Sequence, residues 1–469
     1  MKKFFYIFSA AVLFCLTGCA NKAGSYYDNA VAGSLNMHRI AGSDMHLHNN
    51  ERNPAIFIHG LMGAVLKSEK SSGTADDVVW GRFIYRDMAD RSLFWKIALP
   101  LVDNGNNAAL VHGNILNASQ IRVGGVSAEI GNYKYVIELL QSMGYVLEKT
   151  PAMDSREGAN LFIFTYDWRQ SIDENAVRLA AFIDECKSYL QMIRARDGKK
   201  SDNEIRFDLI GHSMGGLIAR YYVMYGNTKM GGYRDPLPVM NWGGAKNVRK
   251  VIAIATPNNG YADAFMELVN GLKLADLAPV CPAGVLGTFY SCYQMMPDPD
   301  TDSVLWKRSG KKVDIFNIAL WKKYRWGMLG ENEDAVKLLN QAMPDADEQI
   351  RQNVALERVH ESLKKALRFK RMMNKPMGLP PDPVRFYGFA SAGLPTNTVL
   401  EVDEDTGAVS VLRQAPGDGK VCLNSALAEL DTQLCPVCWH STYVLDGAHM
   451  GIMRSELFIR NLTRVLVCE

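Results

Sequence analysis

FDLIGHSMGGLIARYYVMYG, residues 207–226, places one serine between glycines at the point where an apolar stretch gives way to a helical pattern. Phe207, Leu209 and Ile210 predict the end of a buried strand, and apolar or aromatic residues recur at helical spacing after the turn. A serine on such a strand-to-helix turn is held in a strained backbone, with its hydroxyl raised above the end of the sheet. Ser213 is therefore the candidate nucleophile.

Glycines flank Ser213 on both sides. A Cβ at Gly211 or Gly215 is expected to collide with the neighbouring strand or helix, and Gly216 permits close packing. The start of the following helix also offers unpaired N–H groups, of which that of Met214 is a candidate donor to a developing oxyanion. The alternative is an ordinary glycine-rich turn, but the strand and helix context favours a nucleophile.

Strand-like and helix-like segments alternate along the chain, which predicts an α/β protein with a mostly parallel sheet and helices on both faces. Strand candidates and helical patterns lie at residues 54–60, 133–144, 160–169, 173–196, 250–257, 384–393 and 455–466. The alternation breaks at residues 258–383, which are interpreted as a cap inserted into a core of residues 53–257 and 384–469. A helix is expected inside this cap at residues 354–373, and a hairpin with its turn at residues 405–407 follows the cap.

Residues 1–19 predict a lipoprotein signal peptide. Two lysines precede an apolar run that is too short to span a bilayer as a helix. The run ends in LTGC, residues 16–19, which resembles the lipobox of bacterial lipoproteins, and this resemblance implies that Cys19 becomes the lipidated first residue. By the same resemblance, Ala20 points to the outer membrane of a Gram-negative cell. Residues 20–52 are expected to form a tether, and simple secretion with cleavage nearby is the alternative.

The composition excludes some partners and leaves the disulfides open. A formal net charge of +2 gives no strong field, so nucleic acid is not an expected partner. DPDTD, residues 298–302, lacks the glycine and distal glutamate of a calcium loop, and no metal or cofactor is expected. Seven cysteines remain after Cys19, an odd number, so at least one is unpaired within the chain. Cys281 and Cys292 close a short loop, and CPVC at residues 435–438 favours a disulfide or hairpin knuckle over a metal site.

A serine nucleophile needs a general base and a carboxylate that orients the base, and in an α/β-hydrolase the acid and then the histidine follow the serine along the chain. Three histidines lie downstream: His360, His440 and His449. His360 falls inside the predicted cap helix, whereas His449 lies in LDGAHMGIM, after the last strand-like segment, STYVL. His449 is therefore the candidate base, and His440 is the alternative.

Asp418, in the glycine-bracketed turn PGDGKV, is the candidate acid because the acid is expected on a loop late in the sheet. Asp446 is closer in sequence but stands only three residues before His449. Asp403 and Asp405 have the pattern of hairpin-turn residues, and an ordinary turn aspartate is also the alternative for Asp418.

The second oxyanion donor is expected in FIHGLMG, residues 57–63, which follows the first strand. A glycine allows the chain to turn sharply there, and Leu61 would donate its N–H together with that of Met214. His59, in the same segment, and His212, beside the serine, are interpreted as structural packing residues rather than bases.

These motifs together resemble the lecithin:cholesterol acyltransferase-like family of α/β-hydrolases, which includes bacterial lipases, phospholipases and acyltransferases. The resemblance rests on FTYDWR (residues 164–169), GHSMGGLIARYY, ATPNNG, LWKKYRWGML and PGDGKV, and it spans most of the chain from about residue 54 to residue 453. It implies an α/β-hydrolase fold in which Ser213, Asp418 and His449 are the nucleophile, the acid and the base.

The chain departs from the family pattern at a few positions without losing a catalytic group. His59 stands where proline is frequent, Lys420 where threonine is frequent, and Asn258 with Asn259 where a histidine-containing pair is more usual. FTYDWR contains a further acidic residue, Asp167, which precedes the serine in the chain and so does not fit the acid position. Asp167 is instead expected to fix a substrate-site loop, with Trp168 at the floor of the site.

The sequence therefore predicts a lipid-anchored serine hydrolase or acyltransferase of the cell envelope, acting through an acyl-enzyme on acyl esters, above all lipids. Lipase, phospholipase and O-acyltransferase activities all fit, because either water or a bound alcohol can accept the acyl group. The expected partners are the acyl-ester substrate and the membrane, reached through Cys19. The alternative from another class is a non-catalytic envelope scaffold that keeps the fold and binds lipid or glycan.

Overall fold

The computed structural model of the 469-residue chain describes residues 52–69, 77–81, 91–102, 110–116, 119–123, 126–130, 133–148, 158–198, 204–273, 280–381, 383–429 and 436–469. The predicted signal peptide with Cys19, and all but the last residue of the predicted tether, lie outside these ranges. The chain divides into two compact units: Met1–Arg52, Tyr135–Gly144 and Met453–Glu469 form the smaller, and Asn53–Lys134 and Tyr145–Ile452 form the larger. None of the helices in the described ranges combines the length and the apolar character that crossing a bilayer requires.

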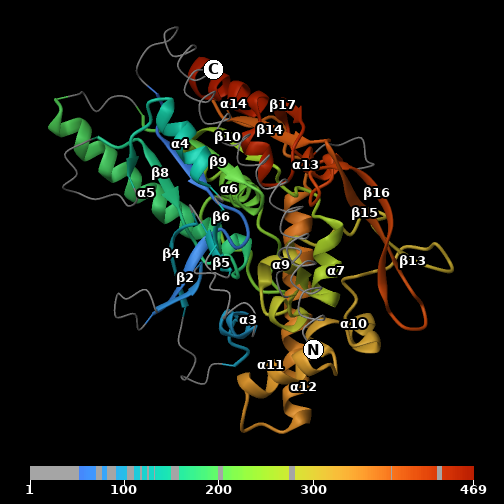
Figure 1. Cartoon of the computed structure of the whole chain (residues 1–469). Helices are drawn as coiled ribbons and strands as arrows, with labels where there is room; N and C mark the ends of the chain where they lie inside the picture. The colour runs from blue at the N-terminus through green and yellow to red at the C-terminus, as the bar shows by residue number, and fades with distance from the viewer. Residues whose placement is uncertain are drawn as a thin grey trace, which may run out of the picture. The chain divides into compact units, whose positions relative to one another are not determined.

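Seven parallel strands form the central sheet of the larger unit (Figure 1). Along the chain they are β1 (Ala55–Ile58), β7 (Leu147–Glu148), β8 (Leu161–Phe164), β9 (Phe207–His212), β10 (Val248–Ile254), β14 (Arg385–Ser391) and β17 (Trp439–Leu445). Their order in the sheet is β17-β14-β10-β9-β1-β8-β7, and every described pair of neighbours is parallel. The predicted α/β class and mostly parallel sheet are confirmed, and the fold is that of an α/β-hydrolase.

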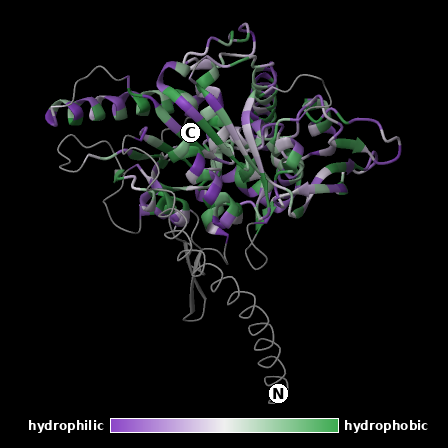
Figure 2. Ribbon diagram, turned by 90° about the horizontal axis from the view of Figure 1, so that it is seen from above, coloured by the Kyte–Doolittle hydropathy of each residue, from purple (hydrophilic) through white to green (hydrophobic). Residues whose placement is uncertain are grey.

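Apolar sequence on both faces of the central strands accounts for their burial. All residues of β1, β8 and β9 are buried, as expected for parallel strands that are covered on both sides. The helix α6 (Met214–Tyr225) packs on β1, β9 and β10 and against α5 (Ile172–Arg196). Every residue of α6 is buried, whereas hydrophilic and hydrophobic residues alternate along α5 (Figure 2). The segment that carries Ser213 therefore lies in the buried core of the larger unit.

Between β10 and β14 the chain forms a set of helices, the segment that the sequence assigns to the cap. It contains α7 (Ala262–Asn270), α8 (Ala283–Leu286), α9 (Tyr290–Gln294), α10 (Ile318–Tyr324), α11 (Glu333–Ala342) and α12 (Glu348–Met373), with the short strands β11 (Leu272–Lys273), β12 (Val280–Cys281) and β13 (Val304–Trp306). α12 begins at Glu348 rather than at residue 354, because the Asp347 carboxylate caps it by accepting from the N–H of Ile350 (2.8 Å). Its first turns are polar, so apolar spacing did not reveal them.

A hairpin follows β14, as predicted. β15 (Leu394–Val402) and β16 (Val409–Gly417) pair antiparallel, and β13 pairs with β15. The Asp403 carboxylate accepts from the N–H groups of Asp405 and Thr406, so Asp403 is a turn residue. The strands reach further in both directions than the sequence pattern suggested, and the end of β16 leads directly into the Asp418 turn.

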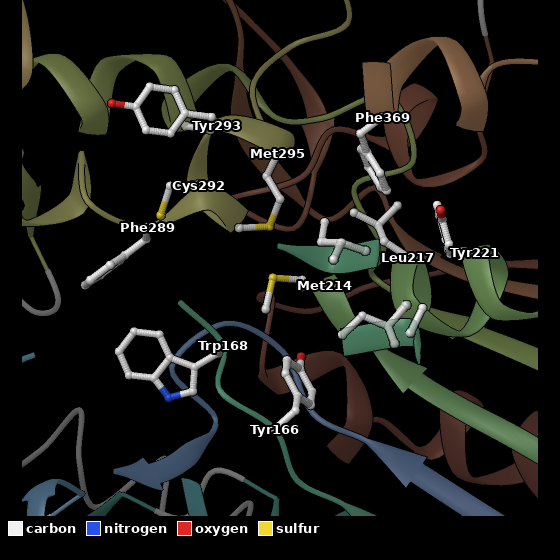
Figure 3. Packing of buried hydrophobic residues seen from close by; sticks show 14 of the residues in the cluster. Tyr166, Trp168, Met214, Leu217, Tyr221, Phe289, Cys292, Tyr293, Met295 and Phe369 are labelled. Carbon is white, nitrogen blue, oxygen red and sulfur yellow. The ribbon is translucent and has the colours of Figure 1, made fainter. Parts of the chain in front are cut away.

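Shorter elements complete the larger unit. They are α3 (Ser92–Lys96), α13 (Leu423–Ala426), β2 (Ala64–Ser68), β3 (Val78–Trp80), β4 (Leu110–Ile115), β5 (Ser119–Val123) and β6 (Val126–Ile130). One hydrophobic cluster joins the sheet, α6 and the segment between β10 and β14. Figure 3 shows part of it: Met214, Leu217 and Tyr221 of α6 with Phe289, Met295 and Phe369.

The smaller unit contains most of α4 (Lys134–Ser142) together with α14 (Glu456–Thr463). Within it, the guanidinium of Arg454 lies 4.3 Å from the centre of the Tyr135 ring. The closing helix was expected at residues 455–466, and the chain instead changes from α14 to a π-helix at Arg464–Cys468.

Candidate active site

Ser213 lies at the turn between β9 and α6 in a backbone conformation that is unusual for a residue with a side chain. Its φ is 53° and its ψ is −123°. Such a conformation costs roughly 1–3 kcal/mol and persists only where the surroundings enforce it. Here the Ser213 N–H donates to the carbonyl of Ile254 on β10 (2.8 Å), and the Ser213 carbonyl accepts from the N–H of Gly216 (3.0 Å). The strained turn that the sequence predicts is present.

The glycines on either side of Ser213 are required by close approach, and this prediction is confirmed. A Cβ on Gly211 would lie 2.5 Å from the amide nitrogen of Gly216, and a Cβ on Gly215 would lie 2.3 Å from the carbonyl oxygen of Ile58 on β1. Both distances are far below van der Waals contact, so a side chain at either position would separate α6 from the sheet. Glycine therefore lets α6 begin directly against β1, with its first turn beside Ser213.

Ser213, His449 and Asp418 form one chain of hydrogen bonds. Nε2 of His449 is 3.0 Å from Oγ of Ser213, and Nδ1 of His449 is 2.8 Å from Oδ2 of Asp418. Because an ionised carboxylate only accepts, Nδ1 carries the proton and Nε2 is left to accept from the serine hydroxyl. The three residues follow β9, β16 and β17, so the fold brings together side chains from three separate loops.

Asp418 is buried and held as a carboxylate. Its Oδ1 accepts from the backbone N–H groups of Lys420 (2.8 Å) and Val421 (2.7 Å), and its Oδ2 faces His449. Burial alone would raise the pKa of this carboxyl, but the charge and hydrogen bond of His449 and the two backbone hydrogen bonds outweigh burial, so the pKa of Asp418 lies below its usual value. The negative charge can therefore orient His449 and stabilise an imidazolium there.

The backbone of His449 is held as well as its ring. Its N–H donates to the carbonyl of Asp418 (2.9 Å), and its carbonyl oxygen lies 3.1 Å from Nε2 of His212. Ser213 and Asp418 are almost fully buried, whereas 20% of the His449 side chain is exposed. His449 is therefore the most accessible of the three.

The loop after β1 lies directly against Ser213. A Cβ on Gly60 would be 2.9 Å from the Cβ of Ser213, so Leu61 follows immediately after the point of contact. Within the described ranges, no acceptor is found for the backbone N–H of Leu61 or for that of Met214, the first residue of α6. The structure thus places both candidate oxyanion donors on segments that adjoin the serine.

His59 and His212 are buried and neutral, which fits their interpretation as structural residues rather than bases. Burial lowers the pKa of each to about 3. The His59 ring stacks on Tyr166 with 4.1 Å between ring centres, and its Nδ1 lies 2.7 Å from the carbonyl oxygen of Gly60. His212 does more than pack, since its Nδ1 is 3.1 Å from the hydroxyl of Tyr133. The sequence reasoning missed Tyr133, which it treated only as the start of a helix.

The other histidines and carboxylates that the sequence offered lie elsewhere. His360 is on α12, and His440 is exposed on β17, where its ring faces Tyr387 with 5.2 Å between ring centres. His440 was expected in a loop, but β17 begins one residue before it and pairs with β14. Asp446 is exposed, and Asp405 forms an ion pair with Arg308 (2.7 Å).

Asp167 and Trp168 are both buried, but none of their hydrogen bonds reaches Ser213, Asp418 or His449. The Asp167 carboxylate accepts from Nε and Nη2 of Arg169 (2.9 and 2.8 Å). Their other partners lie on nearby segments: the Asp167 carbonyl accepts from Asn175, the Trp168 indole N–H donates to the carbonyl of Ala64, and the Trp168 carbonyl accepts from the hydroxyl of Ser291. These bonds fix the loop after β8. Trp168 is completely buried, so a substrate cannot touch it in this conformation.

The cysteines and acidic residues form no metal centre in the part of the chain that the structure describes. Cys281 and Cys292 are buried and free rather than joined, and burial raises the pKa of each thiol. Cys422 and Cys438 are also free, and Cys435 of the CPVC motif lies outside the described residues.

A protein-family model matches more than half of the chain. The sequence model of the lecithin:cholesterol acyltransferase family matches residues 115–415. This range includes Ser213 but ends before Asp418 and His449, so the placement of the acid and the base depends on the geometry above.

Two plant proteins are among the similar sequences. Phospholipase A(1) LCAT3 of Arabidopsis thaliana is 24% identical over 459 residues, which cover 87% of this chain and 88% of that protein. Lecithin-cholesterol acyltransferase-like 4 of Arabidopsis thaliana is 26% identical over 230 residues, 48% of this chain and 38% of that protein.

Among solved structures, the crystal structure of the Tle4–Tli4 complex contains a chain that is similar in fold. The TM-score is 0.50 at 14% identity, and the match covers 89% of this chain and 98% of that chain. At this identity the similarity supports the fold alone.

Proposed function

The chain belongs to the lecithin:cholesterol acyltransferase family, and from that premise we propose that it is a serine hydrolase or acyltransferase whose acyl-ester substrate is a lipid. The observation that carries the proposal is the chain of hydrogen bonds from Asp418 through His449 to Ser213, which ends on a strained turn at the centre of the sheet. A buried carboxylate, an oriented imidazole and a serine hydroxyl in this order form the machinery of nucleophilic acyl transfer.

In the first half of the reaction, His449 Nε2 takes the hydroxyl proton while Oγ of Ser213 attacks the ester carbonyl carbon. The carbonyl oxygen gains a negative charge, which the N–H groups of Leu61 and Met214 stabilise. The imidazolium is stabilised by Asp418 and then gives its proton to the leaving alcohol as the carbon–oxygen bond of the ester breaks. An acyl group remains on Ser213.

In the second half, an acceptor hydroxyl replaces the leaving alcohol. His449 removes the proton of this acceptor hydroxyl, and the acceptor oxygen attacks the acyl carbonyl carbon. The proton then returns to the oxygen of Ser213 as the bond between the acyl group and Ser213 breaks. Water as the acceptor gives a free fatty acid, and an alcohol gives a new ester. Both outcomes use the same residues, so the acceptor is determined by what binds beside His449.

A glycerophospholipid is the first substrate to test. The similarity to a phospholipase A(1) over most of both chains supports this choice. We further propose that the protein is attached to the cell envelope, at the outer membrane, through a lipid on Cys19, which places the larger unit within reach of membrane lipids. Labelling with a palmitate analogue tests the attachment, and equal labelling of wild type and Cys19→Ala would contradict it.

The proposed chemistry is tested with a fluorophosphonate probe and with vesicles of 1-palmitoyl-2-oleoyl phosphatidylglycerol. Wild type is expected to bind the probe covalently and to release palmitate, oleate or both, as measured by mass spectrometry. Ser213→Ala is expected to lose the labelling and to release less fatty acid by a factor of at least about 10³. Adding a long-chain alcohol to the vesicles distinguishes acyl transfer from hydrolysis by the new ester.

Ser362→Ala is the matched control for loss of a buried serine hydroxyl. Ser362 lies on α12 and donates to the carbonyl of Arg358 one turn earlier, away from the nucleophile. Its labelling and turnover are expected to equal those of wild type. Undiminished labelling of Ser213→Ala would refute the assignment of the nucleophile, and a labelled enzyme that releases no fatty acid would refute the lipid substrate.

A further inference from the structure

A second set of hydrogen bonds connects the three loops that carry the proposed chemistry. The backbone N–H of Gly60 donates to the hydroxyl oxygen of Tyr133 (2.8 Å). The same hydroxyl lies 3.1 Å from Nδ1 of His212, and Nε2 of His212 lies 3.1 Å from the carbonyl oxygen of His449. Gly60 and His212 lie close together, since a Cβ added to Gly60 would be 3.3 Å from Nδ1 of His212. We call this set the Tyr133–His212 bridge.

The chemistry of the groups fixes the direction of every hydrogen bond in the bridge. His212 is neutral because burial lowers its pKa to about 3, so its ring has one donor and one acceptor. The His449 carbonyl only accepts, so Nε2 of His212 carries the proton and Nδ1 accepts. The Tyr133 hydroxyl therefore donates to Nδ1, and its oxygen accepts from the Gly60 N–H. Each donor has one acceptor, and reversing any bond would leave two donors or two acceptors facing each other.

At three places, Gly60, His212 and His449, the bridge adjoins a group that the proposed mechanism uses. Gly60 precedes Leu61, a proposed oxyanion donor, and His212 precedes Ser213. The end opposite Gly60 is the backbone carbonyl of His449, the proposed base. An ester carbonyl must meet the nucleophile and the oxyanion donors at the same moment, and an error of about 1 Å in their relative placement can reduce the rate by about 10²-fold. The Ser213–His449–Asp418 hydrogen bonds do not involve the Leu61 loop, whereas the bridge does.

We propose that Tyr133 and His212 are positioning residues, which hold the oxyanion loop, the nucleophile turn and the base loop at fixed distances from one another. This inference rests on the proposed function, and it adds two residues that touch no reacting atom. The bridge acts on the arrangement of the transition state rather than on binding of the acyl chain. Loss of the bridge is therefore expected to lower kcat and to leave KM almost unchanged.

Tyr133→Phe removes the bridge with little other change. The Tyr133 ring packs edge-to-face on Phe57 (5.4 Å between ring centres) and on His212 (5.6 Å), and phenylalanine keeps both contacts. The variant is expected to lower kcat for p-nitrophenyl butyrate about tenfold, and to lower the maximal rate of fluorophosphonate labelling equally. KM and the probe concentration at half-maximal rate are expected to change less than twofold.

Tyr225→Phe is the matched control. Tyr225 is also buried, and its variant loses one hydrogen bond, from the hydroxyl to the carbonyl of Met372 (2.9 Å), where Tyr133→Phe loses two; Tyr225 lies at the far end of α6. It is expected to lower the melting temperature by no more than Tyr133→Phe does and to leave kcat at the wild-type value. The number of active sites in each preparation is counted by probe stoichiometry, so kcat is independent of any unfolded fraction.

Two substitutions of His212 test the two hydrogen bonds of its ring separately. The amide of His212→Gln reaches as far as Nε2 and can still donate to the His449 carbonyl, whereas the amide of His212→Asn reaches only as far as Nδ1. His212→Gln therefore keeps the bond to His449 and loses the acceptor for Tyr133, whereas His212→Asn keeps an acceptor for Tyr133 and loses the bond to His449. Each variant breaks one bond of the bridge, and each is expected to lose about tenfold in kcat. Adding Tyr133→Phe to His212→Asn is expected to lower kcat little further, because both changes break the same bridge.

The outcomes separate the inference from the function on which it rests. If wild type is not labelled by the probe at Ser213, the proposed function fails. If wild type is labelled and Tyr133→Phe reacts at the wild-type rate, or its loss lies in KM, only the bridge is refuted. A wild-type kcat in both His212→Gln and His212→Asn would also refute it, and this comparison remains decisive if Tyr133→Phe does not fold.

Discussion

The two sides of the Ser213 hydroxyl are built in different ways. One side, which we call the elbow side, consists of β1, the loop after it, and α6. These segments approach so closely that there is no room for a Cβ on Gly211 or Gly215, and the histidines there, His59 and His212, are buried and neutral. On the base side, His449 is held by hydrogen bonds from its ring and its backbone, and its partner Asp418 is charged. The structure of the elbow side therefore depends on the close packing of backbone and on uncharged histidines. The structure of the base side, which we define as His449 and Asp418 with their loops, depends on the charge of Asp418 and on the direction of its hydrogen bond with His449.

The largest effect is expected from removing the charge on the base side. Asp418→Asn keeps the volume of the side chain, but its amide can donate to Nδ1 of His449 and so moves the ring proton to Nε2, which then cannot accept from Ser213. We expect kcat to fall by about 10³–10⁴-fold at pH 8, with a small change in the free energy of unfolding. Steady-state hydrolysis of a p-nitrophenyl ester measures the first quantity, and urea unfolding measures the second.

Asp446→Asn is the control for this change, because Asp446 is exposed and lies three residues before the same histidine. Its kcat is expected to stay within about twofold of wild type. A large loss in Asp446→Asn with little loss in Asp418→Asn would assign the acid to Asp446 and overturn the description of the base side.

A large loss of stability is expected from adding one carbon on the elbow side. Alanine favours an α-helix over glycine by about 1 kcal/mol, so propensity alone predicts that Gly215→Ala stabilises α6. The new Cβ would however lie 2.3 Å from the Ile58 carbonyl oxygen, which is backbone and cannot turn away. We expect the free energy of unfolding to fall by at least about 3 kcal/mol, with activity lost as the turn is displaced.

Gly451→Ala is the matched change on the base side. The nearest atom to a Cβ on Gly451 is 3.7 Å away, which is ordinary contact, so we expect a change of less than about 0.5 kcal/mol. Equal losses in Gly215→Ala and Gly451→Ala would show that close approach does not distinguish the two sides.

The elbow side was largely predictable from sequence because its determinants are local. The spacing of apolar residues predicts β9 and α6. The glycines next to Ser213 indicate that the backbones of the strand and the helix approach each other closely there. The base side was less predictable, because nothing local distinguishes His440 from His449. That choice required the position of the last strand, and β17 begins earlier than the apolar pattern suggested and includes His440.

Tyr133 was not predictable at all from local pattern. Its sequence neighbours give it the role of a helix start, and its polar partners lie 73 and 79 residues away in the chain. Only the arrangement of β1 beside β9 brings the Gly60 and His212 partners to its hydroxyl. The first turn of α12 was missed for the opposite reason, since it is polar and exposed and carries no apolar periodicity.

The smallest of the three effects is a difference in acid sensitivity between the two sides. Burial lowers the pKa of His59 and of His212 from 6.5 to about 3, so between these values the unfolded chain binds protons that the folded chain does not. The free energy of unfolding therefore falls as pH falls below 6.5, by about 1.4 kcal/mol per pH unit for each histidine. Asp418 has a lowered pKa, so its contribution is present above its ordinary value of 3.8 and is lost only below it.

Between pH 6 and pH 4.5, the difference between wild type and His59→Phe therefore isolates the contribution of one of the two elbow-side histidines. Phenylalanine can keep the stacking on Tyr166 and removes one hydrogen bond, from Nδ1 of His59 to the carbonyl of Gly60, because Nε2 has no partner among the described residues. Urea unfolding at several pH values is expected to show a slope smaller than that of wild type by about 1.4 kcal/mol per pH unit. Tyr166→Phe is the control, because it loosens the same contact by removing the hydrogen bond from the Tyr166 hydroxyl to the His59 carbonyl. It removes no group that titrates in this pH range. It should therefore lower the free energy of unfolding without changing its slope against pH. Equal slopes in wild type and His59→Phe would mean that His59 is protonated in the folded protein, and neutrality would no longer distinguish the elbow side from the base side.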